Sequence, residues 1–123
     1  MSTEPGLPRN FLRPCVLLLL REAPAHGYDL VERLRVFGFG GEDPGRLYRT
    51  LRGLETEGLV RSAWERSTHG PDRRIYVVTS RGMEVLYEQV TGLRETAKVI
   101  DGLVSRYSEF VAIGAPATPA RAR

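Results

Sequence analysis

The chain has 123 residues, of which 41% are hydrophobic and 27% are charged, and its formal net charge is +3. This length and composition suit one ordinary soluble domain with an extension and exclude two full cores. The single cysteine, Cys15, excludes an intramolecular disulfide framework, and together with His26 and His69 it lacks the spacing of a zinc site. We therefore expect neither a metal nor another cofactor.

The first helix is expected from Phe11 to Arg21, after a loose tail at residues 1–10. Its apolar run, Val16 to Leu20, is far too short to span a bilayer, and charged residues follow it where a signal peptide would have its cleavage region. No membrane association is expected, and the cytoplasm, close to the nucleoid, is the expected location. Cys15 is interpreted as a small core residue rather than a redox sensor.

A second helix is expected from His26 to Val36, because Pro24 ends the first one. Its predicted packing side consists of Tyr28, Leu30, Val31 and Leu34. Gly38, Gly40 and Gly41 follow. No strand precedes these glycines and the dinucleotide-binding spacing is absent, so they are interpreted as a flexible connector.

A third helix with two different faces is predicted from Pro44 onward. Asp43 can cap its start, Pro44 fits the first helical position, and Gly58 can adopt the left-handed conformation that ends it. Leucines at positions 47, 51 and 54 form one stripe, which should face the core. The opposite half carries Gly45, Arg46, Arg49, Arg52 and Gly53, with Tyr48 on the flank. Such arginines can form an ordinary solvated face or a basic surface for a partner.

A two-stranded ribbon is predicted directly after this helix, over Val60–Arg66 and Arg73–Thr79. The loop tip between them gathers Arg66, His69, Arg73 and Arg74, which could reach phosphates or a minor groove. Trp64 is interpreted as a core anchor rather than a base-stacking platform. Residues 44–81 hold eight arginines and four acidic residues, a local charge of +4, so the rest of the chain carries −1. The basic charge is thus confined to the helix and ribbon, a combination typical of a winged helix that binds DNA.

The C-terminal part predicts one long helix, which Thr79 or Ser80 can cap. Its apolar residues recur at alternating spacings of three and four: Met83, Leu86, Val90, Leu93, Ala97, Ile100, Val104, Tyr107 and Val111. This is a heptad seam of about 42 Å at 1.5 Å per residue, longer than a compact winged unit needs. A homodimer is the favoured interpretation, and packing within the chain is the alternative.

Three segments also carry a family resemblance: LLLLREAPAHGYDLVERL, DPGRLYRTLRGLETEGLV and GPDRRIYVVTSRG. The matching positions are His26, Gly27 and Tyr28, then Pro44, Gly45, Leu47 and Tyr48, then Leu54, Glu55, Gly58 and Leu59, and finally Gly70, Arg74, Tyr76 and Thr79. From about Arg13 to Met83 the chain resembles the PadR family of bacterial transcriptional regulators. The single C-terminal helix resembles the smaller PadR subfamily. RPCVLLLL with GRLYRTL resembles the branch often labelled poly-β-hydroxybutyrate-responsive repressors.

This resemblance implies that the third helix approaches the major groove, that the wing reaches the minor groove or the DNA backbone, and that the C-terminal helix joins two protomers. Many relatives carry Thr and Pro around the Leu-Tyr pair, where this chain has Arg46 and Arg49. The predicted DNA-binding residues are Gly45, Arg46, Tyr48, Arg49, Arg52, His69, Gly70, Arg73 and Arg74. The predicted dimerisation residues are Leu86, Val90, Leu93, Ala97, Ile100, Val104 and Tyr107.

The expected fold class is α+β, mostly α. A winged helix-turn-helix domain is expected over residues 11–79 and a dimerisation helix over 80–113, with disordered tails at 1–10 and 114–123. The expected function is that of a sequence-specific regulator that binds double-stranded promoter DNA as a homodimer and represses a pseudo-palindromic operator.

A small apolar effector could release the DNA by entering between Leu12, Val16, Leu19 and the C-terminal helices at the dimer centre. Activation in place of repression and a winged helix used only for protein contact are the alternatives. Catalysis is not expected, because no nucleophile, base and orienting acid occur at a plausible spacing.

Overall fold

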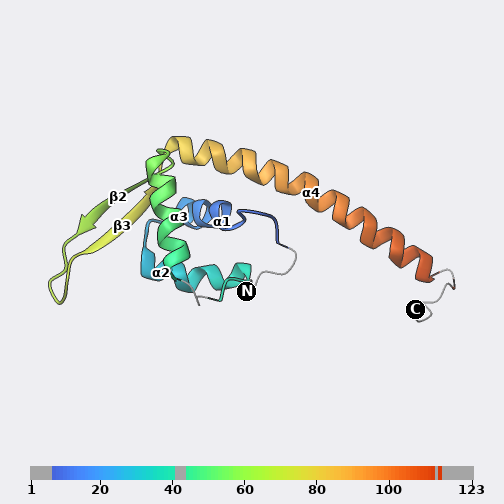
Figure 1. The fold of residues 1–123 in the computed structure, drawn as a ribbon, viewed down its shortest axis with the longest axis horizontal. Coiled ribbons are helices and arrows are strands. Elements are labelled where there is room, and N and C mark those ends of the chain that lie inside the picture. Colours follow the sequence, from blue (N-terminus) through green and yellow to red (C-terminus); the bar gives the residue numbers. More distant parts are fainter. Residues whose placement is uncertain (1–6, 41–43, 113, 115–123) are drawn as a thin grey trace. The chain divides into compact units, whose positions relative to one another are not determined.

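The computed structural model describes residues 7–40, 44–112 and 114. Its elements in chain order are α1 (Leu12–Glu22), β1 (Ala25–His26), α2 (Gly27–Arg33), the 3-10 helix η1 (Leu34–Phe37), α3 (Pro44–Thr56), β2 (Val60–Glu65), β3 (Arg73–Val78) and α4 (Ser80–Ala112) (Figure 1). The chain divides into two compact units, Met1–Gln89 and Val90–Arg123, so α4 begins in the first unit and ends in the second. The expected tails lie mostly outside the described residues, and the domain boundaries stay a prediction.

The core of the first unit is built around α1 and the leucine stripe of α3. Val16 and Leu17 of α1 are fully buried, and so is Leu54 of α3. Helix α1 is apolar on most of its surface, which is typical of a helix that other elements surround. It contacts α2, α3 and β3. Cys15 is buried in this core, as predicted.

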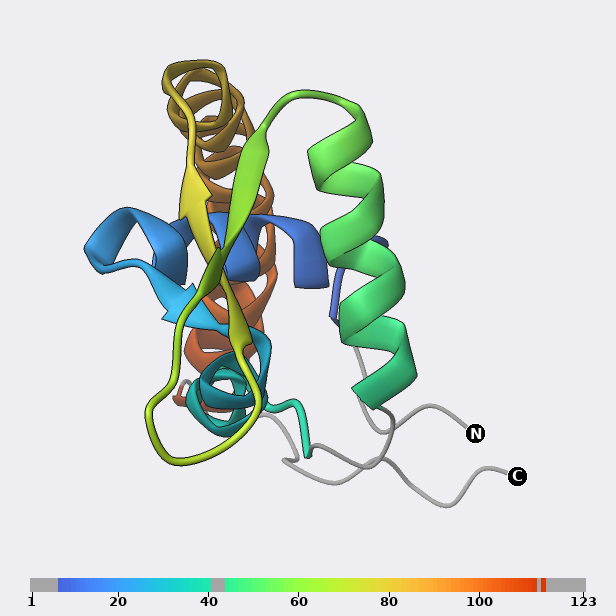
Figure 2. The same cartoon turned by 90° about the vertical axis from the view of Figure 1, so that its left-hand side faces the viewer.

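The sheet of the first unit has three antiparallel strands in the order β1-β3-β2. Strands β2 and β3 form the predicted ribbon, in which Val60 pairs with Val78 and Trp64 with Arg74. Figure 2 shows this ribbon beside α3, which contacts β2. The mostly helical α+β class and the winged helix-turn-helix arrangement are therefore confirmed.

The region around His26 differs from the prediction of one helix. Ala25 and His26 form the short strand β1, in which His26 pairs with Ile75 of β3. Helix α2 then begins at Gly27 and lasts only seven residues before η1 tightens the chain. A two-residue strand has no periodicity to detect, and its partner lies almost fifty positions away, so the sequence does not reveal it.

The burial predicted from the sequence is wrong for two aromatic residues, Tyr28 and Trp64. Tyr28 was expected on the packing side of the second helix, yet 70% of it is exposed, because Leu30 and Leu34 alone fill the core from this segment. Trp64 was expected as a core anchor, yet 66% of it is exposed. It lies near the far end of β2, opposite Arg74, where the ribbon extends past the buried Val60.

Helix α3 has the start, the end and the buried stripe that the sequence predicts. It begins at Pro44, and Leu47, Leu51 and Leu54 are buried. Gly58 adopts a positive φ of 78°, and the amide of Leu59 donates to the carbonyl of Leu54 at 2.9 Å, which closes the helix end. The predicted cap, Asp43, lies outside the described residues.

The start of α4 is fixed to the end of α3. The Thr79 hydroxyl accepts a hydrogen bond from the Gly82 amide at 3.0 Å, which is an N-cap, and donates to the Gly58 carbonyl at 2.7 Å. Gly82 lies directly against the backbone of Leu59: a Cβ built on it would be 2.1 Å from the Leu59 carbonyl oxygen. The first turn of α4 thus packs on the backbone of Leu59 as well as on the side chain of Val78.

The part of α4 in the second unit is a regular helix with one apolar face. Six of its large apolar residues are between 53% and 73% exposed: Val99, Ile100, Leu103, Val104, Tyr107 and Phe110. Over the described residues, no helix combines the length and the apolarity needed to cross a membrane.

Candidate DNA interface

The outer face of α3 presents arginines beside the wing. Arg49 and Arg52 are exposed, and Arg46 is half-buried. The Arg46 guanidinium lies over the ring of Phe39, 5.6 Å from its centroid, a cation–π contact that helps to hold the side chain. Phe39 is itself buried and stacks on Phe11. The sequence identified these arginines, but it gave no sign of the aromatic support under Arg46.

Tyr48 rests on the start of α2. A Cβ on Gly27 would lie 2.6 Å from Cε1 of Tyr48 and 2.7 Å from its hydroxyl oxygen, closer than such contacts occur in proteins. Gly27 therefore makes room for the Tyr48 ring, whose residue remains 41% exposed. Gly27 and Tyr48, which are 21 residues apart in the sequence, are thus in direct contact at the flank of α3.

Arg74 is held by a chain of contacts across three elements. Its Nε donates to the Ser62 hydroxyl at 2.9 Å, and that hydroxyl donates to the Glu55 carboxylate at 2.7 Å. The Arg74 guanidinium also lies over the ring of Trp64, 4.9 Å from its centroid. This support positions Arg74 within β3, beside α3, instead of at the loop tip. The sequence missed Ser62 and Glu55 as its partners.

Tyr76 is the buried residue of β3. Burial raises the pKa of its phenol above the ordinary value of 10.0, the guanidinium of Arg74 lowers that pKa, and Glu55 and Tyr48 raise it. The phenol is therefore neutral at physiological pH, as suits a residue that is only 8% exposed.

His26 connects β1 to the wing. Its Nε2 lies 2.6 Å from a carboxylate oxygen of Glu65 on β2, and its Nδ1 lies 3.3 Å from one of Asp29 on α2. The residue is half-buried. The sequence places His26 at the start of a helix and does not reveal this contact, because only the fold brings Glu65 to it.

The loop between β2 and β3 carries the remaining candidates. The Ser67 amide donates to the Asp72 carboxylate at 3.1 Å, and the Thr68 hydroxyl lies 2.9 Å from Nδ1 of His69. His69, Gly70 and Arg73 are exposed. The loop thus presents polar groups at the end of the ribbon, next to the exposed Arg66 and Arg73. Arg74, which was also predicted at the loop tip, lies within β3.

A charged helix face, a ribbon with basic residues beside it and a core that supports both are the parts of a DNA-binding winged helix. Comparison with known proteins decides the family: residues 16–88 match the transcriptional regulator PadR-like family. The chain belongs to the PadR family.

Among the relatives of this PadR regulator, the transcriptional regulator Rv3488 of Mycobacterium tuberculosis is 36% identical over 98 residues, which cover 76% of this chain and 90% of that protein. A PadR family regulator from Eggerthella lenta is 33% identical, with a TM-score of 0.66, and the match covers 76% of this chain and 80% of its own. A PadR-like regulator from Bacillus cereus is 27% identical, with a TM-score of 0.68, and the match covers 76% and 90%.

Membership in this family of DNA-binding transcriptional regulators, which is non-enzymatic, confirms that the chain is not an enzyme. Among the described residues, no group of three or more His, Cys, Asp or Glu side chains could hold a metal ion.

If Tyr48 contacts DNA, as the sequence predicts, changing Gly27 to alanine is expected to reduce the DNA affinity of this PadR regulator by about fivefold. The new Cβ would displace the Tyr48 ring and remove a hydrogen bond from its hydroxyl to the DNA, worth about 1 kcal/mol. The fold should be retained, since Tyr48 can move toward solvent. Titration of a DNA duplex measures the affinity, and thermal melting of the protein shows whether the fold is retained. Tyr48→Phe should give a similar loss, and the double variant should lose no more than either single one. Additive losses in the double variant would show that Gly27 acts independently of Tyr48.

Proposed function

We propose that this PadR regulator is a homodimer that places two copies of α3 in successive major grooves of a pseudo-palindromic operator. The observation that carries the proposal is the exposed arginine face of α3 beside a wing that is also basic. In dimers of this kind the half-sites lie about one helical turn, or 34 Å, apart. Bound in this way, the dimer represses by blocking access to the promoter.

Each predicted residue has a role in this proposal. Arg49 and Arg52 contact guanine edges or phosphates, because a guanidinium can donate two hydrogen bonds to O6 and N7 of guanine. Arg46 contacts the duplex next to Gly45, where the backbone of α3 can approach closely. Tyr48 donates its hydroxyl to a phosphate.

The wing supplies the second set of contacts. His69, Gly70 and Arg73 at the loop reach the backbone or the minor groove. Arg74 binds a phosphate between the wing and α3, because Ser62 and Trp64 hold its guanidinium there. A cation that is already oriented loses less entropy on binding than a mobile one.

The dimer is proposed to form through α4. At 100° per residue the six exposed apolar residues between Val99 and Phe110 fall within an arc of about 140°. Val90, Leu93 and Ala97 extend this face toward the start of the helix, whereas Leu86 is already buried within the first unit. A face of this width on one helix favours coverage by a second copy, as heptad seams do.

Two finer features are also proposed. The sequence motifs RPCVLLLL and GRLYRTL support membership in the branch labelled poly-β-hydroxybutyrate-responsive repressors. An apolar effector that enters beside α1 at the dimer centre could change the spacing of the two α3 helices and release the DNA.

Arg49→Ala is expected to weaken operator binding by about 1 to 3 kcal/mol, or about 5- to 160-fold, if Arg49 reads a base. A shift assay at fixed salt concentration measures this loss. The matched control is Arg61→Ala, which removes the same charge from an exposed position on β2 outside the α3 face. Unchanged affinity and unchanged sequence preference for Arg49→Ala would remove Arg49 from the base-reading set.

A further inference from the structure

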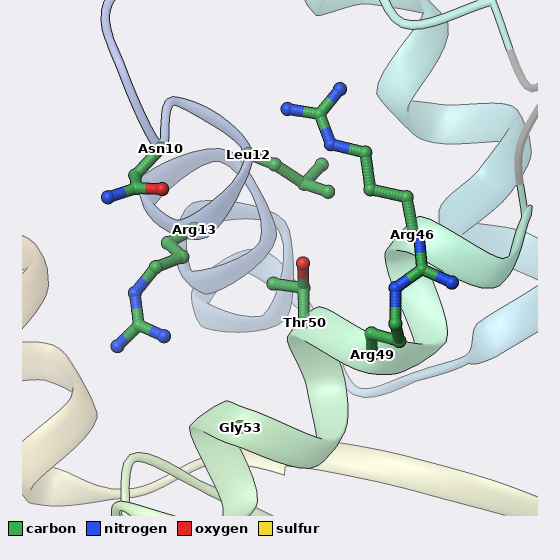
Figure 3. A pocket seen from close by; sticks show the side chains of 7 residues that line it. All are labelled: Asn10, Leu12, Arg13, Arg46, Arg49, Thr50 and Gly53. Carbon is green, nitrogen blue, oxygen red and sulfur yellow. The ribbon is translucent and has the colours of Figure 1, made fainter.

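A hollow of about 260 Å³ lies between the start of α1 and the outer face of α3, within the first unit. Figure 3 shows Arg13 on the α1 side and Arg46 and Arg49 on the α3 side, with the Thr50 hydroxyl directed into the space between the two helices. The described lining residues are Asn10, Leu12, Arg13, Arg46, Arg49, Thr50 and Gly53. Its volume accommodates a phosphate group with several waters, each of which takes about 30 Å³.

The chemistry of this lining fits an oxyanion. Three of the described lining residues are arginines and none is acidic. Guanidinium groups donate paired N–H bonds to phosphate oxygens, and a threonine hydroxyl and an asparagine amide add neutral donors. Gly53 has no side chain to fill the hollow, and a Cβ there would lie 3.9 Å from Nη1 of Arg13.

Among the described residues, Arg13 has one ion-pair partner, Glu57, which lies outside the lining. Its Nη2 lies 2.7 Å from a carboxylate oxygen of Glu57, at the end of α3, and the two side chains are 25% and 52% exposed. Exposed ion pairs of this kind contribute little to stability. A guanidinium has five N–H donors, so Arg13 can keep this pair and still face the hollow.

We propose that the hollow binds a phosphate oxyanion, with Arg13 of α1 as the residue that extends the basic surface beyond α3 and the wing. Arg13 shares this hollow with Arg46 and Arg49, which lie on the face of α3 that is proposed to meet the duplex. The backbone of the bound duplex is therefore the indicated source of the phosphate, because at least half of all protein–DNA hydrogen bonds go to phosphate and sugar oxygens. In this form the inference rests on the proposed DNA-binding function. A free phosphate compound has the same chemistry and is distinguished by the experiment.

The test compares Arg13→Ala with Glu57→Gln in the full-length chain, by titration of one duplex over a series of salt concentrations. Arg13→Ala should weaken binding about tenfold for all sequences alike and reduce the salt slope by about 1, as loss of one phosphate contact does. Glu57→Gln removes the same ion pair but leaves the cation, so its affinity should equal or exceed that of the natural chain. An equal loss in both variants would show that Arg13 acts only by fixing α1 to α3, which overturns the proposal.

Inorganic phosphate is the second probe. It is added to the chain without DNA at constant ionic strength, and the nuclear magnetic resonance signals of the Thr50 and Gly53 backbone amides are followed. Lower DNA affinity of Arg13→Ala, with the affinity of Glu57→Gln retained, identifies the duplex as the source of the phosphate. Saturable shifts that Arg13→Ala abolishes, with unchanged DNA affinity, identify a free phosphate compound. If Arg13→Ala changes neither the DNA affinity nor the amide shifts caused by phosphate, the hollow is not a phosphate site, while the proposed function stands. If the natural chain binds no DNA, the proposed function fails and the phosphate titration alone decides on the hollow.

Discussion

Aspartate at both Ile100 and Val104 is expected to separate the proposed homodimer into protomers and to remove most of its affinity for the proposed operator. In the single chain these residues are 54% and 53% exposed, and they lie in the middle of the apolar face of α4. A second copy that covers this face would bury four unpaired carboxylates, each at a cost of several kcal/mol. The dissociation constant of the dimer should increase by at least about 100-fold. Sedimentation at several protein concentrations measures this constant.

The matched control places two aspartates on the other side of the same helix, at Gly102 and Ser105. Both positions are exposed, and a Cβ on Gly102 would meet no other atom within 4 Å. The change in charge is identical, so this variant should remain a dimer and bind the operator with slightly lower affinity because of its added negative charge. Sedimentation of the Ile100 and Val104 variant as a dimer would refute the proposed seam.

Replacement of Gly82 by alanine is expected to cause the largest loss of stability among single changes in the first turn of α4. The added Cβ would be 2.1 Å from the carbonyl oxygen of Leu59 and 2.7 Å from Cγ2 of Val78. A backbone oxygen cannot rotate aside as a side chain can, so α4 must move away from the wing. We expect the free energy of unfolding to fall by about 3 kcal/mol, at the upper end of the usual range for overpacking.

Urea denaturation measures this loss. The protein concentration is kept fixed, because the stability of the proposed dimer would depend on it. Gly92→Ala, in the same helix, is the control. A Cβ at that position meets nothing within 4 Å, so the change should raise stability by about 0.5 to 1 kcal/mol through helix propensity. Equal stability of Gly82→Ala and the natural chain would mean that the first turn of α4 does not pack against Leu59.

The elements that the sequence predicts well are those with a local signal. Helix α3 is marked by Pro44 at its start, by leucines at helical spacing and by Gly58 at its end, and all of these features recur in the structure. The ribbon is marked by β-branched residues around a turn-forming loop, and its bounds are correct to within one residue. The Thr79 cap and the length of α4 follow from equally local patterns.

The features that the sequence does not reveal depend on residues far apart in the chain. The need for glycine at position 27 is visible only in the fold, where the Tyr48 ring lies against it. Likewise, Arg74 lies within β3 and not at the loop tip, where Ser62 and Trp64 contact its side chain. Trp64 itself illustrates the limit, since burial of an aromatic residue on a hairpin depends on how far the neighbouring helices reach. Arg13 lies in an apolar helix sequence and joins the α3 arginines only in three dimensions.

Selection of DNA duplexes from a random pool by the full-length chain, at about 0.15 M salt, tests the central claim most directly. We predict enrichment of one pseudo-palindrome whose half-sites are centred about 10 base pairs, or one helical turn, apart. A winged helix used only for protein contact enriches no sequence. Recovery of an unselected pool, at protein concentrations where the chain is folded, would contradict the operator-binding function proposed for this PadR regulator.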